Sequence, residues 1–490
     1  MSKRGINRLQ NLLLVVLFIT AVFLLSRIPQ LNGDWANQFQ AFLAHTVDVP
    51  ESQSTNLSAA VSAVHIVVTG DSEYGRYSQL YTPVDSALFQ QVSPLFQEAL
   101  GSASEIGATA DKTLQEALST PGIYMDLTMD LPLEVVAAWL GEETEYSRSV
   151  RAMALTTEED SFAVLYLYSS DGSIFRYYTA LPISAVTELS NAYPPNSGAF
   201  AFESNYTTLA PYTVLTTSSI TAPAIYAAIP AGYSSYNLLT ALDFNAHTSF
   251  RYQESSGAEV ITESPRTLRL DPDGTVTYAG STEAASSLYH VSASGEKKPT
   301  AVEALQACLQ ITAALTDSIG ASPLYLRGVE ETDTGWVMSF GYQAAGLPVV
   351  FADGEDALTI TIYGQTITSF TYRCQSYTPS EENSPLLPAT MAMAIASLHP
   401  GSGLSLGYVD PGGDILYAQW LESRPPARKE IRLGDLSLEK YCHTDPSPAE
   451  CIFAHAAGVS VSPVQADRLR HRGTAAHPVC RQPAYAVGFC

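Results

Sequence analysis

The stretch WVMSFGYQAAGLPVVFADGEDALTITIYGQTITSFTYRC, residues Trp336–Cys374, decides the fold that we predict from the sequence. It consists of short runs rich in β-branched and aromatic residues, separated by breaks that contain glycine or acidic residues. Such runs are typical of consecutive antiparallel strands. The predicted strands are Trp336–Gln343, Val349–Phe351, Leu358–Tyr363 and Thr366–Cys374.

Helices and further strands surround this stretch. In Val302–Ile319, apolar residues such as Leu305 and Leu315 recur on one face of a helix. The other predicted helices are Val84–Leu100, Leu133–Leu140 and Ala389–Leu398, and the other predicted strands are His65–Val68, Ile123–Leu127, Ala163–Tyr168, Ile174–Tyr178, Arg266–Leu270, Thr275–Tyr278, Leu404–Val409 and Ile415–Trp420. We therefore predict an α+β fold with meandering antiparallel sheets and flanking helices.

Composition and charge narrow the class of protein. The chain has 490 residues, of which 46% are hydrophobic, 15% are charged and 27 are tyrosine. This composition excludes a mainly disordered chain, a coiled coil and a collagen-like fibre. The formal net charge is −24. The electrostatic field of such a negatively charged protein repels the phosphate backbone of nucleic acid. Nucleic acid is therefore not expected as a partner.

An apolar run, LLLVVLFITAVFLL, lies near the N-terminus and is about 21 Å long as a helix. If the helix extends from Leu9 to Ile28, it is long enough to cross the hydrocarbon core of roughly 30 Å. The side chains of Arg8 and Arg27 can then extend to the aqueous surfaces of the membrane. The basic residues before the run predict a cytoplasmic N-terminus and an extracytoplasmic body in a single-pass protein of the cell membrane. The predicted membrane helix consists of Leu12, Leu13, Leu14, Val15, Val16, Leu17, Phe18, Ile19, Thr20, Ala21, Val22, Phe23, Leu24 and Leu25.

A cleaved signal peptide is the competing interpretation of this run, because its apolar stretch is typically as short. Cleavage needs a pair of small residues just before the cut site, and Leu24–Pro29 offers no such pair. We therefore expect an uncleaved signal anchor. Helices meet in lipid through close packing, so the smallest residues, Thr20, Ala21 and Ser26, are the candidate helix contact. Exposure of these residues to lipid is the alternative.

Changes in composition divide the chain into segments. Residues 424–490 hold nine basic and six acidic residues and four of the six cysteines, whereas the body before them is acidic. We interpret this tail as disordered or read in a shifted frame, because the strand periodicity also stops there. The predicted segments are a cytoplasmic stub and membrane anchor (1–29), a stalk (30–58), an N-terminal α+β domain (59–200), a middle β-rich domain with a linker (201–299), a C-terminal α+β domain (300–423) and the basic Cys/His-rich tail (424–490).

Three patterns associated with catalysis or metal binding lack the context that they need. Gly403–Gly407 matches G-x-S-x-G, but a strand is expected after the serine, where a nucleophile elbow needs a helix. Ser294–Lys297 matches S-x-x-K but lies in a linker. Asp271–Gly274 is better explained as a hairpin turn than as a calcium loop. We therefore expect no catalytic, metal-binding or cofactor-binding residue, no cofactor and no enzyme activity.

The cysteines fall into two groups. Cys308 and Cys374 are expected as small buried hydrophobic residues, with a disulfide between them as the alternative. The tail contains four possible zinc ligands, but their spacing differs from that of standard structural zinc sites. These residues are Cys442, His443, Cys451 and His455.

The layout resembles the YycH/YycI family, extracytoplasmic regulators of the WalK-type sensor histidine kinase. The likeness covers most of residues 1–421, is one of pattern and contains no invariant chemical motif. The three-segment body is similar to YycH, and residues 300–423 resemble the YycI-type fold, whereas the tail departs from the family. The likeness rests on Met1–Ile28, Ile123–Leu140, Arg266–Tyr278, Trp336–Cys374 with its Gly346–Val349 step, Leu386–Leu398, Leu404–Tyr408 and Tyr417–Trp420.

The resemblance implies a non-enzymatic, membrane-anchored regulator. It would bind a WalK-type sensor histidine kinase through its transmembrane helix, while the outer domains position the helix or meet a sister YycI-like regulator. Two other classes remain open. One is an extracellular cell-wall- or peptide-binding module without kinase control, and the other is an unrecognised cell-wall hydrolase, which needs a nucleophile or paired carboxylates in a cleft.

Overall fold

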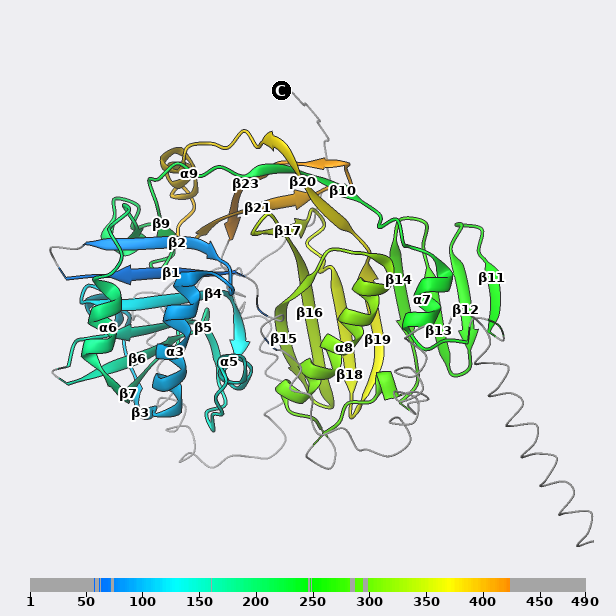
Figure 1. The fold of residues 1–490 in the computed structure, drawn as a ribbon, viewed down its shortest axis with the longest axis horizontal. Coiled ribbons are helices and arrows are strands. Elements are labelled where there is room, and N and C mark those ends of the chain that lie inside the picture. The colour runs from blue at the N-terminus through cyan, green and yellow to red at the C-terminus, as the bar shows by residue number, and fades with distance from the viewer. Residues whose placement is uncertain are drawn as a thin grey trace, which may run out of the picture. The chain divides into compact units, whose positions relative to one another are not determined.

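The computed structural model describes residues 57–423, apart from 58–60, 62, 72–74, 160, 246, 248, 283–286 and 294–297 (Figure 1). The chain divides into two units, residues 1–426 and 427–490, and the second unit lies outside the described residues. The predicted membrane helix Leu12–Leu25 and its candidate contact residues also lie outside them.

A seven-stranded antiparallel sheet forms the N-terminal part, in the order β2-β1-β4-β5-β6-β7-β3. The central strands β1, β4, β5 and β6 are rich in apolar residues and mostly buried, whereas the edge strands β2 and β3 are largely half-buried or exposed. The strands are β1 (Val64–Thr69), β2 (Arg76–Thr82), β3 (Ser104–Ala108), β4 (Gly122–Pro132), β5 (Ser149–Thr156), β6 (Phe162–Tyr168) and β7 (Ile174–Pro182).

Both faces of this sheet are covered. Three helices pack on one face (Figure 1), and their residues Val92 and Phe96 belong to the same hydrophobic core cluster as Ile66 and Val68 of β1. These helices are α3 (Ala87–Gly101), α5 (Leu133–Leu140) and α6 (Ile183–Ser190). A smaller core covers the other face and is built on α4 (Asp111–Ala117), the 3-10 turn η2 (Ala201–Glu203) and the short pair β8 (Ala199–Phe200) and β9 (Val214–Leu215).

An eleven-stranded sheet forms the second large element, in the order β11-β12-β13-β14-β19-β18-β16-β17-β21-β23, with β15 paired to β16. Its pairs are antiparallel except for β17 and β21, which run parallel. The strands are β11 (Phe250–Gln253), β12 (Glu259–Glu263), β13 (Arg266–Leu270), β14 (Thr275–Ala279), β15 (Leu324–Thr332), β16 (Gly335–Ala344), β17 (Leu347–Phe351), β18 (Leu358–Tyr363), β19 (Thr366–Arg373), β21 (Gly403–Asp410) and β23 (Ala418–Ser423).

One long helix, α8 (Ala301–Ile319), packs on this sheet, and α7 (Ser235–Ala241) lies beside it (Figure 1). Thr300 and Glu303 form a capping box that starts α8, and Gly320, in the left-handed conformation, ends it. The remaining elements are the 3-10 turn η3 (Ser287–Tyr289), the helix α9 (Ala389–Ala396) and a three-stranded sheet of β20 (Ser376–Asn383), β10 (Pro223–Ala228) and β22 (Ile415–Leu416).

The predicted α+β fold class is wrong, because strands dominate the described residues: 42% are in strands and 22% in helices. Apart from α3 and α8, the described helices have only seven or eight residues each. Several stretches without a predicted structure also form strands, including β2, β5 and β15. In the described residues, no helix has the length and apolar character that a membrane crossing requires.

The strands predicted within Trp336–Cys374 are confirmed as β16 to β19. The predicted strand Ile415–Trp420 is divided instead. Ile415 and Leu416 pair with β10, whereas the chain from Ala418 onward pairs with β21 and continues to Ser423. The middle stretch also joins the larger sheet, because β14 pairs with β19 over five positions from Thr275 to Ala279.

Candidate functional site

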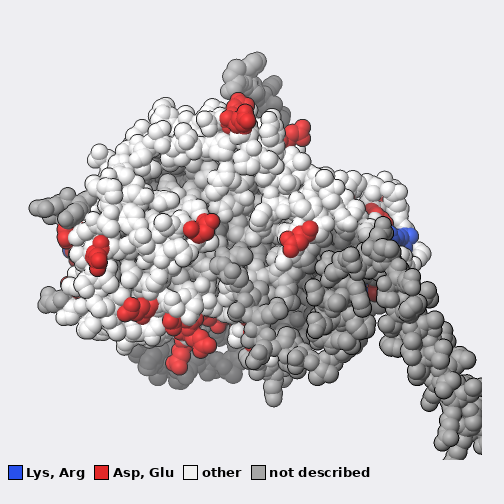
Figure 2. All heavy atoms as spheres, in the orientation of Figure 1, with Lys and Arg blue, Asp and Glu red and all other residues white. Residues whose placement is uncertain are grey.

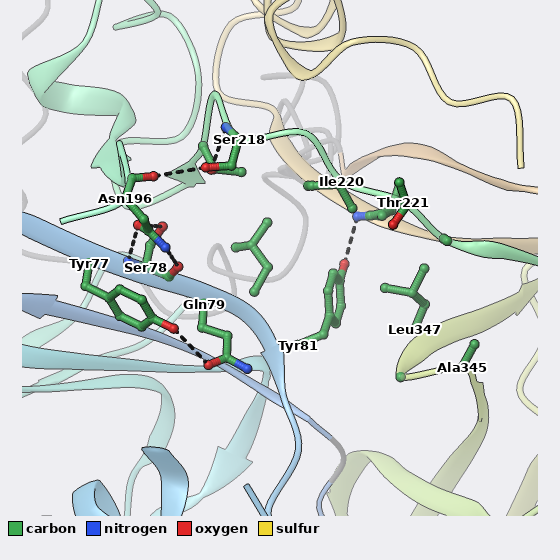
Figure 3. Close-up of a pocket in the computed structure, with 15 residues that line it drawn as sticks. Tyr77, Ser78, Gln79, Tyr81, Asn196, Ser218, Ile220, Thr221, Ala345 and Leu347 are labelled. Atoms are coloured by element: carbon green, nitrogen blue, oxygen red, sulfur yellow. Dashed lines mark hydrogen bonds between the residues drawn. The ribbon is translucent and has the colours of Figure 1, made fainter. Parts of the chain in front are cut away.

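A cavity of about 350 Å³ lies where the edge strand β2 approaches β21 and the turn between β16 and β17 (Figure 3). The segment 216–222, which leads into β10, forms another wall. This volume is near the lower end of the range for small-molecule sites. The lining residues are Tyr77, Ser78, Gln79, Leu80, Tyr81, Asn196, Thr216, Ser218, Ile220, Thr221, Ala222, Ala345, Gly346, Leu347 and Leu406.

Tyr81 connects the two large sheets across this cavity. The register of β1 and β2 shifts near Tyr81, whose backbone adopts the left-handed conformation with φ 52°. Its hydroxyl accepts a hydrogen bond from the Leu406 N–H of β21, with 2.7 Å between oxygen and nitrogen (Figure 3). Burial raises the pKa of Tyr81, so the phenol keeps its proton at neutral pH. The bulge therefore directs the Tyr81 side chain away from the seven-stranded sheet and toward β21 of the eleven-stranded sheet.

Asn196 closes the outer edge of β2 beside the cavity. Its side-chain oxygen accepts from the Ser78 N–H at 2.8 Å, and its side-chain nitrogen donates to the Ser78 carbonyl at 2.6 Å. Its backbone N–H donates to the Arg76 carbonyl at 3.0 Å. A single asparagine thus supplies the hydrogen bonds that a neighbouring strand would otherwise make.

The turn between β16 and β17 lines the opposite wall. Ala345 and Gly346 have φ values of 48° and 80°, the pattern of a type I′ hairpin turn. Glycine adopts this conformation freely, but alanine does not. Tyr81 and Ala345 are therefore two non-glycine residues in left-handed geometry that line one cavity, and Ser197, with φ 66°, directly follows Asn196. Backbone strain of this kind clusters at functional sites.

The lining combines polar and apolar side chains and carries no formal charge. Among the described residues that line the cavity, none is Asp, Glu, Lys, Arg or His. The Tyr77 hydroxyl donates to the Gln79 side-chain oxygen at 3.3 Å, and the Ser218 hydroxyl donates to the Asn196 carbonyl at 3.1 Å. On the face shown in Figure 2, acidic side chains are scattered over a surface that is mostly neither acidic nor basic.

A buried histidine lies directly behind Tyr81. The Tyr81 ring meets the His65 ring edge to face, with 4.6 Å between ring centroids. His65 lies opposite Asp126 in the pairing of β1 and β4, and the Arg151 Nε lies 3.5 Å from the Asp126 Oδ1. Burial lowers the pKa of His65, the nearby Asp126 carboxylate partly opposes this shift, and Arg151 adds to it. His65 is therefore a neutral core residue at physiological pH.

The catalytic and metal-binding patterns considered in the sequence do not contribute to this cavity. Gly403–Gly407 lies inside β21, which confirms the expected strand. Asp271–Gly274 forms the turn between β13 and β14, where the Gly274 N–H donates to the Asp271 carbonyl at 3.1 Å. Ser294–Lys297 and the tail cysteines and histidines lie outside the described residues. Within the described part of the chain, no three or more His, Cys, Asp or Glu residues gather as a metal site would require.

Cys308 and Cys374 are free thiols and are fully buried, as expected for small hydrophobic residues. The alternative disulfide between them is wrong. Burial raises the pKa of both thiols, which keeps them protonated and unreactive.

Sequence reasoning missed the cavity. It assigned no strand to Arg76–Thr82 and placed Asn196 only near the predicted domain boundary at residue 200. The spacing of Tyr77, Gln79 and Tyr81, each two residues from the next, was a signal for an edge strand. The side-chain pairing of Asn196 with a backbone 118 residues away left no local signal.

Comparisons with family models, with curated proteins and with solved structures found no match to this chain.

Proposed function

We propose that the protein is a membrane-anchored extracytoplasmic regulator of a WalK-type sensor histidine kinase and that its role is non-enzymatic. The observation that carries this proposal is the apolar run Leu12–Leu25, which follows three basic residues and precedes a large acidic body. The pattern likeness to the YycH/YycI family supports the same role, and a sister YycI-like regulator is a further proposed partner.

The packing of the body supports transmission of a signal to the membrane. One hydrophobic cluster contains core residues of both large sheets. A hydrogen bond from the Leu406 N–H to the Tyr81 hydroxyl joins the two sheets, and a bond of 2.9 Å from the Ala301 N–H of α8 to the Glu134 Oε1 of α5 joins helices that pack on them. We expect a body held together in this way to move as one piece. It shifts a two-state kinase only as far as it binds one state better than the other.

An extracellular cell-wall- or peptide-binding module without kinase control is the second candidate. The uncharged cavity beside Tyr81 favours it, because a concave site with several hydrogen-bonding side chains is typical of ligand recognition. The position of Ser405 inside β21, rather than on a turn between a strand and a helix, supports a non-enzymatic role in both candidates.

The test replaces residues 9–28 of the full chain with an unrelated single-pass anchor and measures the output of each host sensor kinase with a reporter. Loss of kinase control, with the protein still in the membrane fraction, supports the regulator. Full retention of control contradicts contact through the helix, whereas no kinase response to either form favours the binding module. A membrane two-hybrid assay with residues 1–40 identifies the kinase.

A paired substitution sharpens this test. Changing Thr20 and Ala21 together to leucine enlarges the candidate contact, and changing Val15 and Val22 together to leucine is the matched control on the opposite face of the predicted helix. We expect only the first pair to reduce the two-hybrid signal, because close packing depends on small side chains. Equal signals from both pairs would contradict the assigned contact.

A further inference from the structure

We infer that the cavity beside Tyr81 binds an uncharged saccharide. This inference goes beyond kinase regulation, and it concerns a site that the sequence did not indicate.

The charge of the ligand follows from the lining. A charged ligand entering this cavity loses water, and the lining offers no charged side chain to replace it. An anion also meets the field of a chain with net charge −24. A neutral ligand avoids both costs.

The polar chemistry of the lining favours hydroxyl and amide groups on the ligand. Gln79 and Asn196 bring carboxamides, while Tyr77, Ser78, Ser218 and other lining residues bring hydroxyls. Both group types donate as well as accept hydrogen bonds, as sugar hydroxyls do. Among the hydrogen bonds of the described residues, none uses the Gln79 side-chain nitrogen or the Thr221 hydroxyl. These two groups are therefore available to a ligand.

Apolar groups complete the match. Ile220 and Leu347 lie among the polar groups of the wall, and Tyr77 adds an aromatic ring (Figure 3). A sugar ring has the same mixed character, with C–H groups between its hydroxyls. Amphipathic rings such as tyrosine suit surfaces of this kind because they join an apolar body to a polar tip.

An extended peptide fits less well. A peptide binding beside β2 would pair with its free edge, as in strand addition. Asn196 already occupies both the N–H and the carbonyl of Ser78, and its backbone N–H occupies the Arg76 carbonyl. The edge of β2 is therefore closed to a peptide at Arg76 and Ser78.

The experiment titrates the full-length protein in nanodiscs with chitobiose and with maltose and measures heat. Glucose 6-phosphate and acetyl-trialanine-amide are the charged and peptide comparison ligands. We expect a neutral saccharide to bind more tightly than both comparison ligands. Binding of neither saccharide, or tighter binding of the phosphate or the peptide, would overturn the inference. Kinase output is not measured here, so this result stands apart from that of the anchor replacement.

Variants assign the binding to the cavity. Gln79→Ala and Thr221→Val each remove one available hydrogen-bonding group, so the Kd should rise about three- to tenfold. Thr221 is exposed, so Thr221→Trp fills the cavity without disturbing a core, and binding should be lost. Gln253→Ala and Thr371→Val change the same residue types at exposed positions on β11 and β19 and should leave the Kd unchanged. Saccharide binding that survives Thr221→Trp in a protein of unchanged melting temperature would overturn the assignment.

Discussion

The two large sheets bury their strands in different ways. In β6 of the seven-stranded sheet, every residue from Ala163 to Leu167 is buried, because helices cover one face and a second small core covers the other. In β18 of the eleven-stranded sheet, buried residues alternate with partly exposed ones from Leu358 to Ile362. Alternation thus marks a sheet packed on one face, and an unbroken apolar run marks a strand covered on both faces.

The largest expected effects come from side chains at the centre of each sheet. Leu165→Ala in β6 and Ile360→Ala in β18 should each lower the free energy of unfolding by about 2–5 kcal/mol, because each leaves a cavity in a closed core. Urea unfolding followed by tryptophan fluorescence measures both. A loss of less than about 1 kcal/mol at either position would contradict the burial described for that sheet.

The junction between the sheets should contribute a smaller amount. Tyr81→Phe leaves the Leu406 N–H without its acceptor, so we expect a loss of about 1–3 kcal/mol in the free energy of unfolding. Tyr236, which is 64% exposed, supplies the control Tyr236→Phe, which should change little. Equal losses from both substitutions would mean that the hydrogen bond across the junction adds nothing.

Neighbouring residues test the difference between the sheets directly. Val164 packs on the second face of β6, so Val164→Ala removes two buried carbon atoms and should cost about 1.6 kcal/mol. Thr361 occupies the corresponding second face of β18 and is only partly buried, so Thr361→Ala should change stability by less than about 0.5 kcal/mol. If the two substitutions cost the same, the distinction between the sheets fails.

The last expected effect is a dependence on pH that arises in the seven-stranded sheet. Because burial lowers the pKa of His65, the unfolded chain binds more protons than the folded chain below pH of about 6.5. Stability should therefore be flat above that pH and fall below it, by at most about 1.4 kcal/mol per pH unit. His65→Gln should flatten this slope in urea unfolding at pH 5 to 7. The same slope in both proteins would assign the effect to other groups.

The comparison also explains what the sequence could predict. The predicted boundaries of several strands in the larger sheet agree closely with the structure; for example, the predicted strand Leu358–Tyr363 coincides with β18. The share of strand was underestimated, because stretches such as Arg76–Thr82 mix tyrosine with polar residues and have no strong apolar period. The candidate site could not be predicted, because its geometry depends on residues far apart in the chain, such as Asn196 with Ser78 and Tyr81 with Leu406.

The pairing of β14 with β19 has a practical consequence for anyone who wishes to express part of the chain. A cut at residue 299 would separate these strands and leave each fragment with a bare strand edge five residues long. Such edges recruit other chains and promote aggregation. Because β10 pairs with both β20 and β22, a soluble piece of this region should begin before Pro223 and extend through Ser423.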